Sequence, residues 1–158
     1  MSLLDLVAHL PSVELSPDDV LITEDTTTGS MWVLVEGRLE IRKHGAAIQV
    51  IDRPGATLGE VAALTESSHS ASVVAVTPAR LHVVADGRAL LREHPELLLF
   101  IATELAERLD VVTTYLADLR NQYADTPGIE MVSHVIGRLS HAPAKHTPGS
   151  ARDPDPEY

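Results

Sequence analysis

The sequence predicts a mainly β protein with flanking α-helices, in which an antiparallel β-roll is followed by a long C-terminal helix. Two observations support this fold class. Between positions 20 and 84, short segments of β-branched and other apolar residues alternate with turn residues, as in antiparallel rolls and barrels. An unbroken helical pattern then covers residues 96–123.

The individual elements follow from local signals in chain order. Residues 2–10 form a short amphipathic helix behind a serine cap, and Pro11 ends it. The expected strands are Val20–Thr23, Met31–Val35, Leu39–Arg42, Ala47–Ile51, Ala71–Val76 and Arg80–Val84. Asp86 is placed to cap a helix over 87–93, which ends near Pro95.

These elements divide the chain into four parts. Residues 1–95 form the roll with its short helices, and residues 96–123 form the long helix. Pro127 suits the first turn of a further short helix, expected over 127–141. Residues 142–158 combine prolines and charges with few apolar side chains, so we expect a disordered tail.

The long helix carries an apolar seam with alternating steps of four and three residues. Its members are Leu98, Ala102, Leu105, Leu109, Val112, Leu116, Leu119 and Tyr123. This 3.5-residue repeat is the one by which two helices pack in a coiled coil. We therefore expect a parallel homodimer through residues 98–123, although a helix folded against its own domain would also need an apolar stripe.

Composition excludes several function classes. The 158 residues carry a net charge of −11 with a pI near 5.0, which argues against nucleic acid or an anionic membrane surface as a partner. There is no cysteine, so thiol catalysis, disulfides and thiolate metal sites are excluded. We expect a cytoplasmic location because no segment is long and apolar enough to span a bilayer.

Leu58–Val73 has the layout of an anion cradle. Glycine at position 59 lets the backbone approach a ligand, and the first N–H groups of the helix behind it lack intrahelical partners. Glu60 can accept hydrogen bonds from sugar hydroxyls. His69 and Ser70 lie where the second side of the cradle would contact the anion. Taken singly, Gly59 is a turn residue, Glu60 a first-turn acid and His69 an exposed loop residue.

Gly59-Glu60-Val61-Ala62 and His69-Ser70-Ala71-Ser72-Val73 resemble the phosphate-binding cassette of the cyclic nucleotide-binding domain. This domain is the sensor module of catabolite-activator-type transcription factors, cyclic-nucleotide-dependent kinases and gated channels. The resemblance covers roughly residues 3–123, including the early strands and the Arg53-Pro54-Gly55 turn. It implies a jelly-roll (a double-stranded β-helix) followed by a dimerisation helix.

The sequence departs from this family in two respects. His69 stands where the family has an arginine that takes the cyclic phosphate, and Ser68 stands where a proline often precedes it. A histidine loses its charge near pH 6.5 and reaches less far than arginine, so we expect weaker phosphate binding. The residues after Tyr123 are also too few for a basic helix-turn-helix. We therefore expect a sensor module without the DNA-binding domain that transcription factors of this family carry.

The resemblance implies a site for cAMP or cGMP. Its residues would be Gly59, Glu60, Val61, Ala62, His69, Ser70, Ala71 and Thr113. Main-chain amides and the Ser70 hydroxyl would hold the phosphate, Glu60 the ribose 2′-hydroxyl, and Thr113 the base. A cationic His69 could replace the arginine, in which case affinity would rise at low pH.

Two functions of different classes remain open. The first is a non-enzymatic regulatory module that binds a cyclic nucleotide or a related small ligand and couples it to dimer geometry. The second is a degenerate, ligand-free dimeric scaffold that docks a protein partner. No cofactor, metal or enzyme activity is expected, because the sequence has no nucleophile elbow, no P-loop and no cupin-type His-x-His.

Overall fold

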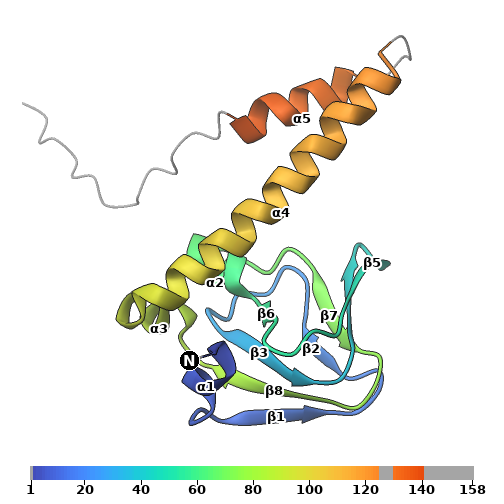
Figure 1. Cartoon of the computed structure of the whole chain (residues 1–158). Helices are drawn as coiled ribbons and strands as arrows, with labels where there is room; N and C mark the ends of the chain where they lie inside the picture. Colours follow the sequence, from blue (N-terminus) through green and yellow to red (C-terminus); the bar gives the residue numbers. More distant parts are fainter. Residues whose placement is uncertain (1, 125–129, 141–158) are drawn as a thin grey trace, which may run out of the picture. The chain divides into compact units, whose positions relative to one another are not determined.

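Eight strands form two four-stranded antiparallel sheets in a computed structural model that describes residues 2–124 and 130–140 (Figure 1). The strands are β1 (Ser12–Leu15), β2 (Val20–Ile22), β3 (Met31–Glu36), β4 (Leu39–Lys43), β5 (Ala46–Ile51), β6 (Thr57–Leu58), β7 (Ser72–Ala75) and β8 (Ala79–Val84). One sheet has the order β1-β8-β3-β6 and the other β2-β7-β4-β5. The predicted β-roll is confirmed.

The main core lies between the two sheets. Leu34 on β3, Leu39 on β4 and Leu81 on β8 are fully buried there, together with Trp32. Successive side chains of a strand point to opposite faces, so Met31 and Val33 project from the other side of β3. Because that side is also covered, β3 is apolar on both faces, which explains its continuous run of apolar residues.

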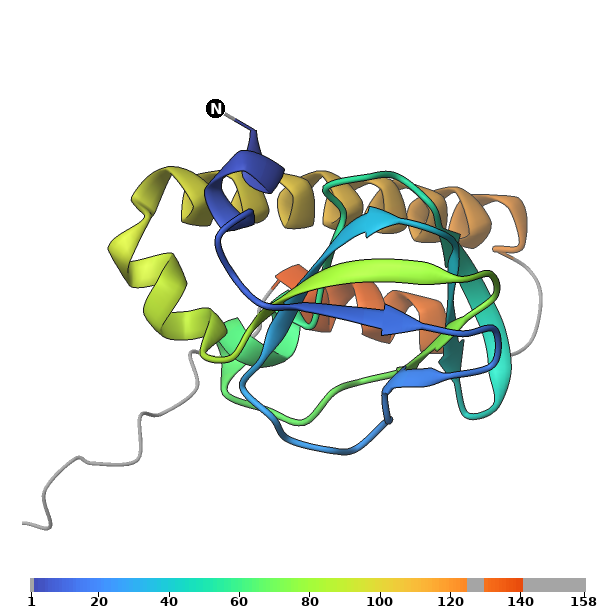
Figure 2. The ribbon, with the colours of Figure 1, turned by 90° about the horizontal axis from the view of Figure 1, so that it is seen from below.

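Helices cover this second face of the first sheet. They are α1 (Leu3–Val7), α2 (Glu60–Thr65), α3 (Gly87–Glu93) and the start of α4 (Pro95–Gln122). Val7, Leu91, Leu97 and Ile101 pack there with Met31 and Val33 in a second apolar cluster. Figure 2 shows β1, β8 and β3 side by side and α1 next to the first turns of α4.

Helix ends follow the predicted signals. Ser2 caps α1 in a reciprocal box with Asp5, and Asp86 caps α3 by accepting a hydrogen bond from the Ala89 amide at 2.9 Å. The helix expected over 96–123 is α4, and α5 (Glu130–Ser140) occupies most of the segment expected over 127–141. The tail expected over 142–158 lies outside the described residues.

The chain divides into two compact units, residues 1–105 and 106–158, with the boundary inside α4. The first unit therefore contains the first turns of α4, where Leu97 and Ile101 are buried. Among the helices described, none is long and apolar enough to cross a membrane.

Two strands were not predicted. β1 pairs with β8 in the register Val13↔Leu81, and β6 pairs with β3 through Trp32↔Leu58. Both are short, and only their distant partners give them strand geometry. This explains why the local pattern did not reveal them.

Candidate functional site

Gly59 begins the site with a backbone conformation that other residues rarely adopt. It caps α2 with φ +80° and ψ 0°, in the left-handed region. A Cβ atom at this position would lie 2.8 Å from the Ser30 carbonyl oxygen and 3.1 Å from the Trp32 ring. Only glycine therefore fits between β6 and α2 without displacing its neighbours.

The first turn of α2 follows directly. The Ala63 amide donates to the Gly59 carbonyl at 3.0 Å, so the helical hydrogen bonds begin at this point. Helix geometry leaves the N–H groups of the first turn, including those of Val61 and Ala62, without acceptors inside the helix. Small side chains at Ala62 and Ala63, both buried, allow α2 to lie close to the roll.

Glu60 is the first residue of α2 and is only 5% exposed. A carboxylate at the start of a helix is favoured by the helix dipole. Val61, the next residue, points outward and is 46% exposed. The cassette thus combines a buried acid with main-chain donors in a single helical turn.

His69 is buried rather than lying in an exposed loop. Its side chain is 3% exposed, and its Nε2 lies 2.8 Å from Thr28 Oγ1. Its ring packs on Trp32 with 5.9 Å between ring centroids and 50° between planes. The space beside Gly59 is therefore filled, because a Cβ there would lie 3.3 Å from His69 Cε1.

Main-chain hydrogen bonds fix the position of His69 in the chain. Its amide donates to the Thr26 carbonyl at 2.8 Å, and its carbonyl accepts from the Asp25 amide at 2.9 Å. The polar 24–30 loop and the second half of the cassette thus hold each other in place.

Burial lowers the pKa of the His69 imidazole below its usual value of 6.5. The neutral form of the ring therefore predominates at pH 7. A neutral ring can donate one hydrogen bond, but it does not supply the permanent charge of an arginine.

The other predicted site residues are less constrained. Ser70 is exposed and Ala71 is half-buried at the entry to β7. Thr113 lies in the second compact unit, and its hydroxyl donates to the Leu109 carbonyl one turn earlier on α4. The structure thus brings Gly59 and His69 together, with Glu60, Val61 and Ala62 adjoining Gly59 on α2.

Sequence reasoning missed the two residues that hold His69. Thr28 lies in a polar loop 41 residues earlier, where nothing in the local pattern marks it. The sequence pattern places Trp32 in a strand but does not mark it as a partner of the cassette. An aromatic residue in a buried strand could have suggested a ring contact, whereas the Thr28 contact depends on the tertiary fold.

Comparisons with known proteins agree with this architecture. A transcriptional regulator from Thermotoga maritima is 22% identical with a TM-score of 0.66, covering 77% of this chain and 99% of that one. The Thermus thermophilus catabolite activator protein is 21% identical with a TM-score of 0.65, covering 89% and 81%. The cAMP-bound PfPKA-R is 21% identical with a TM-score of 0.56, covering 70% and 37%. No curated protein sequence matches the chain.

At identities of 21–22%, similarity to these solved structures shows that the fold is shared and nothing more. The family itself is shown by a sequence model, described as the cyclic nucleotide-binding domain, which matches residues 12–92. The match spans more than half of the chain and includes all eight strands and the whole of α2. This chain therefore belongs to the cyclic nucleotide-binding domain family.

Proposed function

We propose that the chain is a non-enzymatic sensor that binds cAMP or cGMP at the Gly59–Val73 cassette and couples binding to dimer geometry. Domains of this family are typically regulatory rather than catalytic. The observation that carries the proposal is the left-handed Gly59 at the start of α2, next to a buried Glu60. One solved structure with this fold, PfPKA-R, has cAMP bound.

In this proposal the main chain holds the cyclic phosphate. The amides of Val61 and Ala62 in the first turn of α2 would donate to it, with the Ala71 amide and the Ser70 hydroxyl on the opposite side. Glu60 would accept a hydrogen bond from the ribose 2′-hydroxyl. The contact between Thr113 and the base stays a prediction from the family resemblance.

His69 would then support the site in its neutral form. Its ring packs against Thr28, Trp32 and Gly59 and so supports the cassette through these contacts. In its neutral form the ring can donate at most one hydrogen bond, and that bond carries no charge. A hydrogen bond to a charged group contributes about 1.5–3 kcal/mol, so binding without the arginine should be roughly ten- to a hundredfold weaker.

Calorimetry of the full chain with cAMP and with cGMP tests the proposal. We expect weak, saturable binding of one of them, with equal affinity at pH 7 and pH 8 because His69 is already neutral at both. Absence of binding heat for both nucleotides would refute the nucleotide site. Binding that tightens on going to pH 6 would instead assign a cationic role to His69.

The proposed dimer rests on the exposure of the α4 seam. Leu109 is 48% and Val112 is 49% exposed in the single chain, although both repeat at coiled-coil spacing. An apolar stripe of this kind is stabilised when a second helix covers it. We therefore propose a homodimer through residues 98–123.

A second candidate function is a ligand-free scaffold for a protein partner. It is favoured by one observation, that the His69 ring fills the space beside Gly59. The two candidates differ in what His69→Arg should do.

Under the sensor proposal, His69→Arg restores a permanent, bidentate cation and tightens cAMP or cGMP binding by roughly ten- to a hundredfold at pH 8. His44→Arg is the matched control, because it adds the same charge on an exposed turn of the β4–β5 hairpin and should leave affinity unchanged. If the folded His69→Arg variant binds neither nucleotide, the scaffold is the better description.

A further inference from the structure

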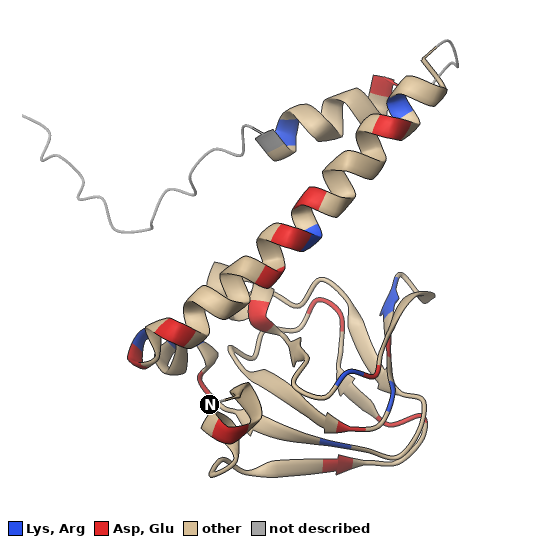
Figure 3. Ribbon diagram, viewed as in Figure 1, with Lys and Arg blue, Asp and Glu red and all other residues tan. Residues whose placement is uncertain are grey.

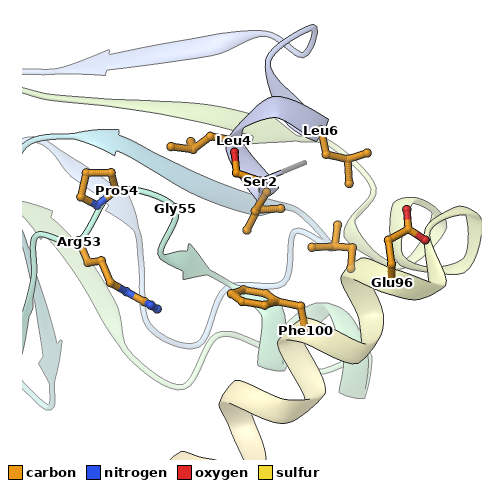
Figure 4. A pocket seen from close by; sticks show the side chains of 10 residues that line it. Ser2, Leu4, Leu6, Arg53, Pro54, Gly55, Glu96 and Phe100 are labelled. Carbon is orange, nitrogen blue, oxygen red and sulfur yellow. The ribbon is translucent and has the colours of Figure 1, made fainter.

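A cavity of about 470 Å³ lies between α1, the Arg53–Gly55 loop and the first turns of α4 (Figure 4). Leucines of α1 form one wall, and Leu97 and Phe100 of α4 form another. In Figure 4 the Phe100 ring extends from α4 toward the loop that carries Arg53. No residue of the Gly59–Val73 cassette lines this cavity.

Its walls are held by contacts of their own. The reciprocal box between Ser2 and Asp5 caps α1, and the α1 leucines pack on the second apolar cluster. The Gly55 amide donates to the Leu34 carbonyl at 2.7 Å, which ties the loop to β3. The cavity is therefore preformed, and its volume lies in the range of roughly 300–1,000 Å³ typical of small-molecule sites.

One cation stands beside the apolar walls. Arg53 Nη2 donates to Glu104 Oε2 at 2.7 Å, and the Arg53 side chain is 61% exposed. An ion pair whose cation is this exposed to solvent contributes little to the stability of the fold. A guanidinium has five N–H donors, so it can hold a second carboxylate or exchange Glu104 for one.

Glu96, the other charged residue of the lining, interacts with His94. Glu96 Oε1 lies 3.3 Å from His94 Nδ1, and the hydrogen bonds to its own backbone amide and to His94 lower the pKa of its carboxyl. Arg53 is therefore the group of the lining that is suited to a ligand anion.

We propose that this cavity binds an amphiphilic carboxylate, with its alkyl chain among the α1 leucines and Phe100 and its head group on Arg53. The lining has the two properties that such a ligand requires, a mainly apolar surface and one accessible guanidinium at its edge. This site is separate from the cassette and does not depend on the nucleotide proposal.

Titration of the full chain with decanoate, below its micelle concentration, tests the proposal. We expect saturable one-to-one binding with a negative heat-capacity change, which marks burial of apolar surface. Decanol lacks the charged head group and should bind roughly tenfold more weakly. Absence of saturable decanoate binding, or equal affinity for decanoate and decanol, would overturn the proposal.

Variants on the two sides of the ion pair locate the head group. Arg53→Gln should weaken decanoate binding roughly tenfold and leave decanol binding unchanged. Glu104→Gln breaks the same ion pair but keeps the cation, so decanoate should bind as tightly as before or more tightly. Equal weakening in both variants would show that the ion pair shapes the cavity and that Arg53 does not hold the ligand.

Neighbouring residues on α4 locate the alkyl chain. Phe100 lines the cavity and is 43% exposed, whereas Leu99 is 67% exposed and does not line it. Phe100→Ala should therefore weaken both decanoate and decanol, and Leu99→Ala should change neither. The same loss in both variants would place the ligand on the outer surface of α4 and refute the cavity site.

Discussion

Gly59 and His69 lie against each other at the start of α2, and together they decide the shape of the cassette. Gly59 needs a left-handed backbone, and a side chain there would meet Ser30, Trp32 and His69. His69 occupies the space that this glycine leaves. The position that the family resemblance assigns to an arginine is thus filled in this chain by a buried imidazole ring that packs on Trp32.

Substitution of Gly59 by alanine should separate close packing from backbone strain. Gly45 is the matched control, since its φ of +78° is nearly that of Gly59 but its Cβ would meet nothing within 4 Å. We expect Gly45→Ala to lower the free energy of unfolding by about 1–2 kcal/mol from strain alone. Gly59→Ala should lower the free energy of unfolding by the same strain and by roughly a further 1–3 kcal/mol, because its Cβ atom clashes with the neighbouring residues. Urea unfolding measures both, and equal losses would contradict the packing described for Gly59.

Burial of His69 makes the stability of the fold depend on pH. Its pKa in the folded state lies below the usual value of 6.5, so the unfolded chain binds the proton more readily. The contribution of the neutral ring is therefore fully present above about pH 6.5 and is lost as the pH falls toward the lower, folded-state pKa.

Urea unfolding of the wild type and of His69→Gln at pH 7.5 and pH 5.5 checks this dependence. The wild type should lose more stability than the variant on acidification, because the glutamine does not titrate. His44→Gln, on an exposed turn, controls for the effect of removing an imidazole elsewhere. The same acid-induced loss in wild type and His69→Gln would contradict the assignment to His69.

At the scale of the element, α4 has two environments along its length. Leu97 and Ile101 in its first turns are buried in the roll, whereas Leu109, Val111 and Val112 are largely exposed in the single chain. One helix thus contributes to the core of the first unit and offers an apolar surface further along. This surface is the basis for the proposed dimer.

Val112 and its neighbour Val111 allow a matched test of that surface. Val112 belongs to the heptad seam, while Val111 lies outside it and is 68% exposed. A buried charge in the seam should abolish the dimer, so Val112→Glu should sediment as a monomer and Val111→Glu as a dimer. A monomeric wild type, or equal dissociation in both variants, would refute the seam as the interface.

At the scale of the whole molecule, the chain carries a large net negative charge of −11. The chain carries 23 acidic and 12 basic residues, and acidic positions occur on α4 and on the loops of the roll (Figure 3). A cyclic nucleotide is itself an anion. The field of the protein therefore opposes its approach, and with His69 neutral the cassette itself supplies no cation at this position.

Salt should consequently favour nucleotide binding. Raising the ionic strength from about 0.01 M to about 0.15 M shortens the Debye length from roughly 30 Å to roughly 8 Å and screens the repulsion. We expect the Kd for cAMP or cGMP to fall over this range, and calorimetry measures it. A Kd that rises with salt would show that a cation of the chain holds the phosphate, contrary to the proposal that main-chain amides and a hydroxyl hold it.

The sequence by itself determined the alternation of short strands and turns, the caps at Ser2 and Asp86, and the long helix with its seam. It also determined the need for glycine at the start of the cassette. These features are local, because periodicity, capping and turn conformation depend on residues a few positions apart.

Only the tertiary structure decided the pairing of β1 with β8, the burial of His69 against Thr28 and Trp32, and the cavity beside Arg53. Each of these depends on segments that are distant in the chain, such as Thr28 and His69, which are 41 positions apart. Whether a histidine among serines is exposed or buried is set by which loop folds over it. The residues next to His69 in the sequence do not indicate that Thr28 and Trp32 are its partners in the fold.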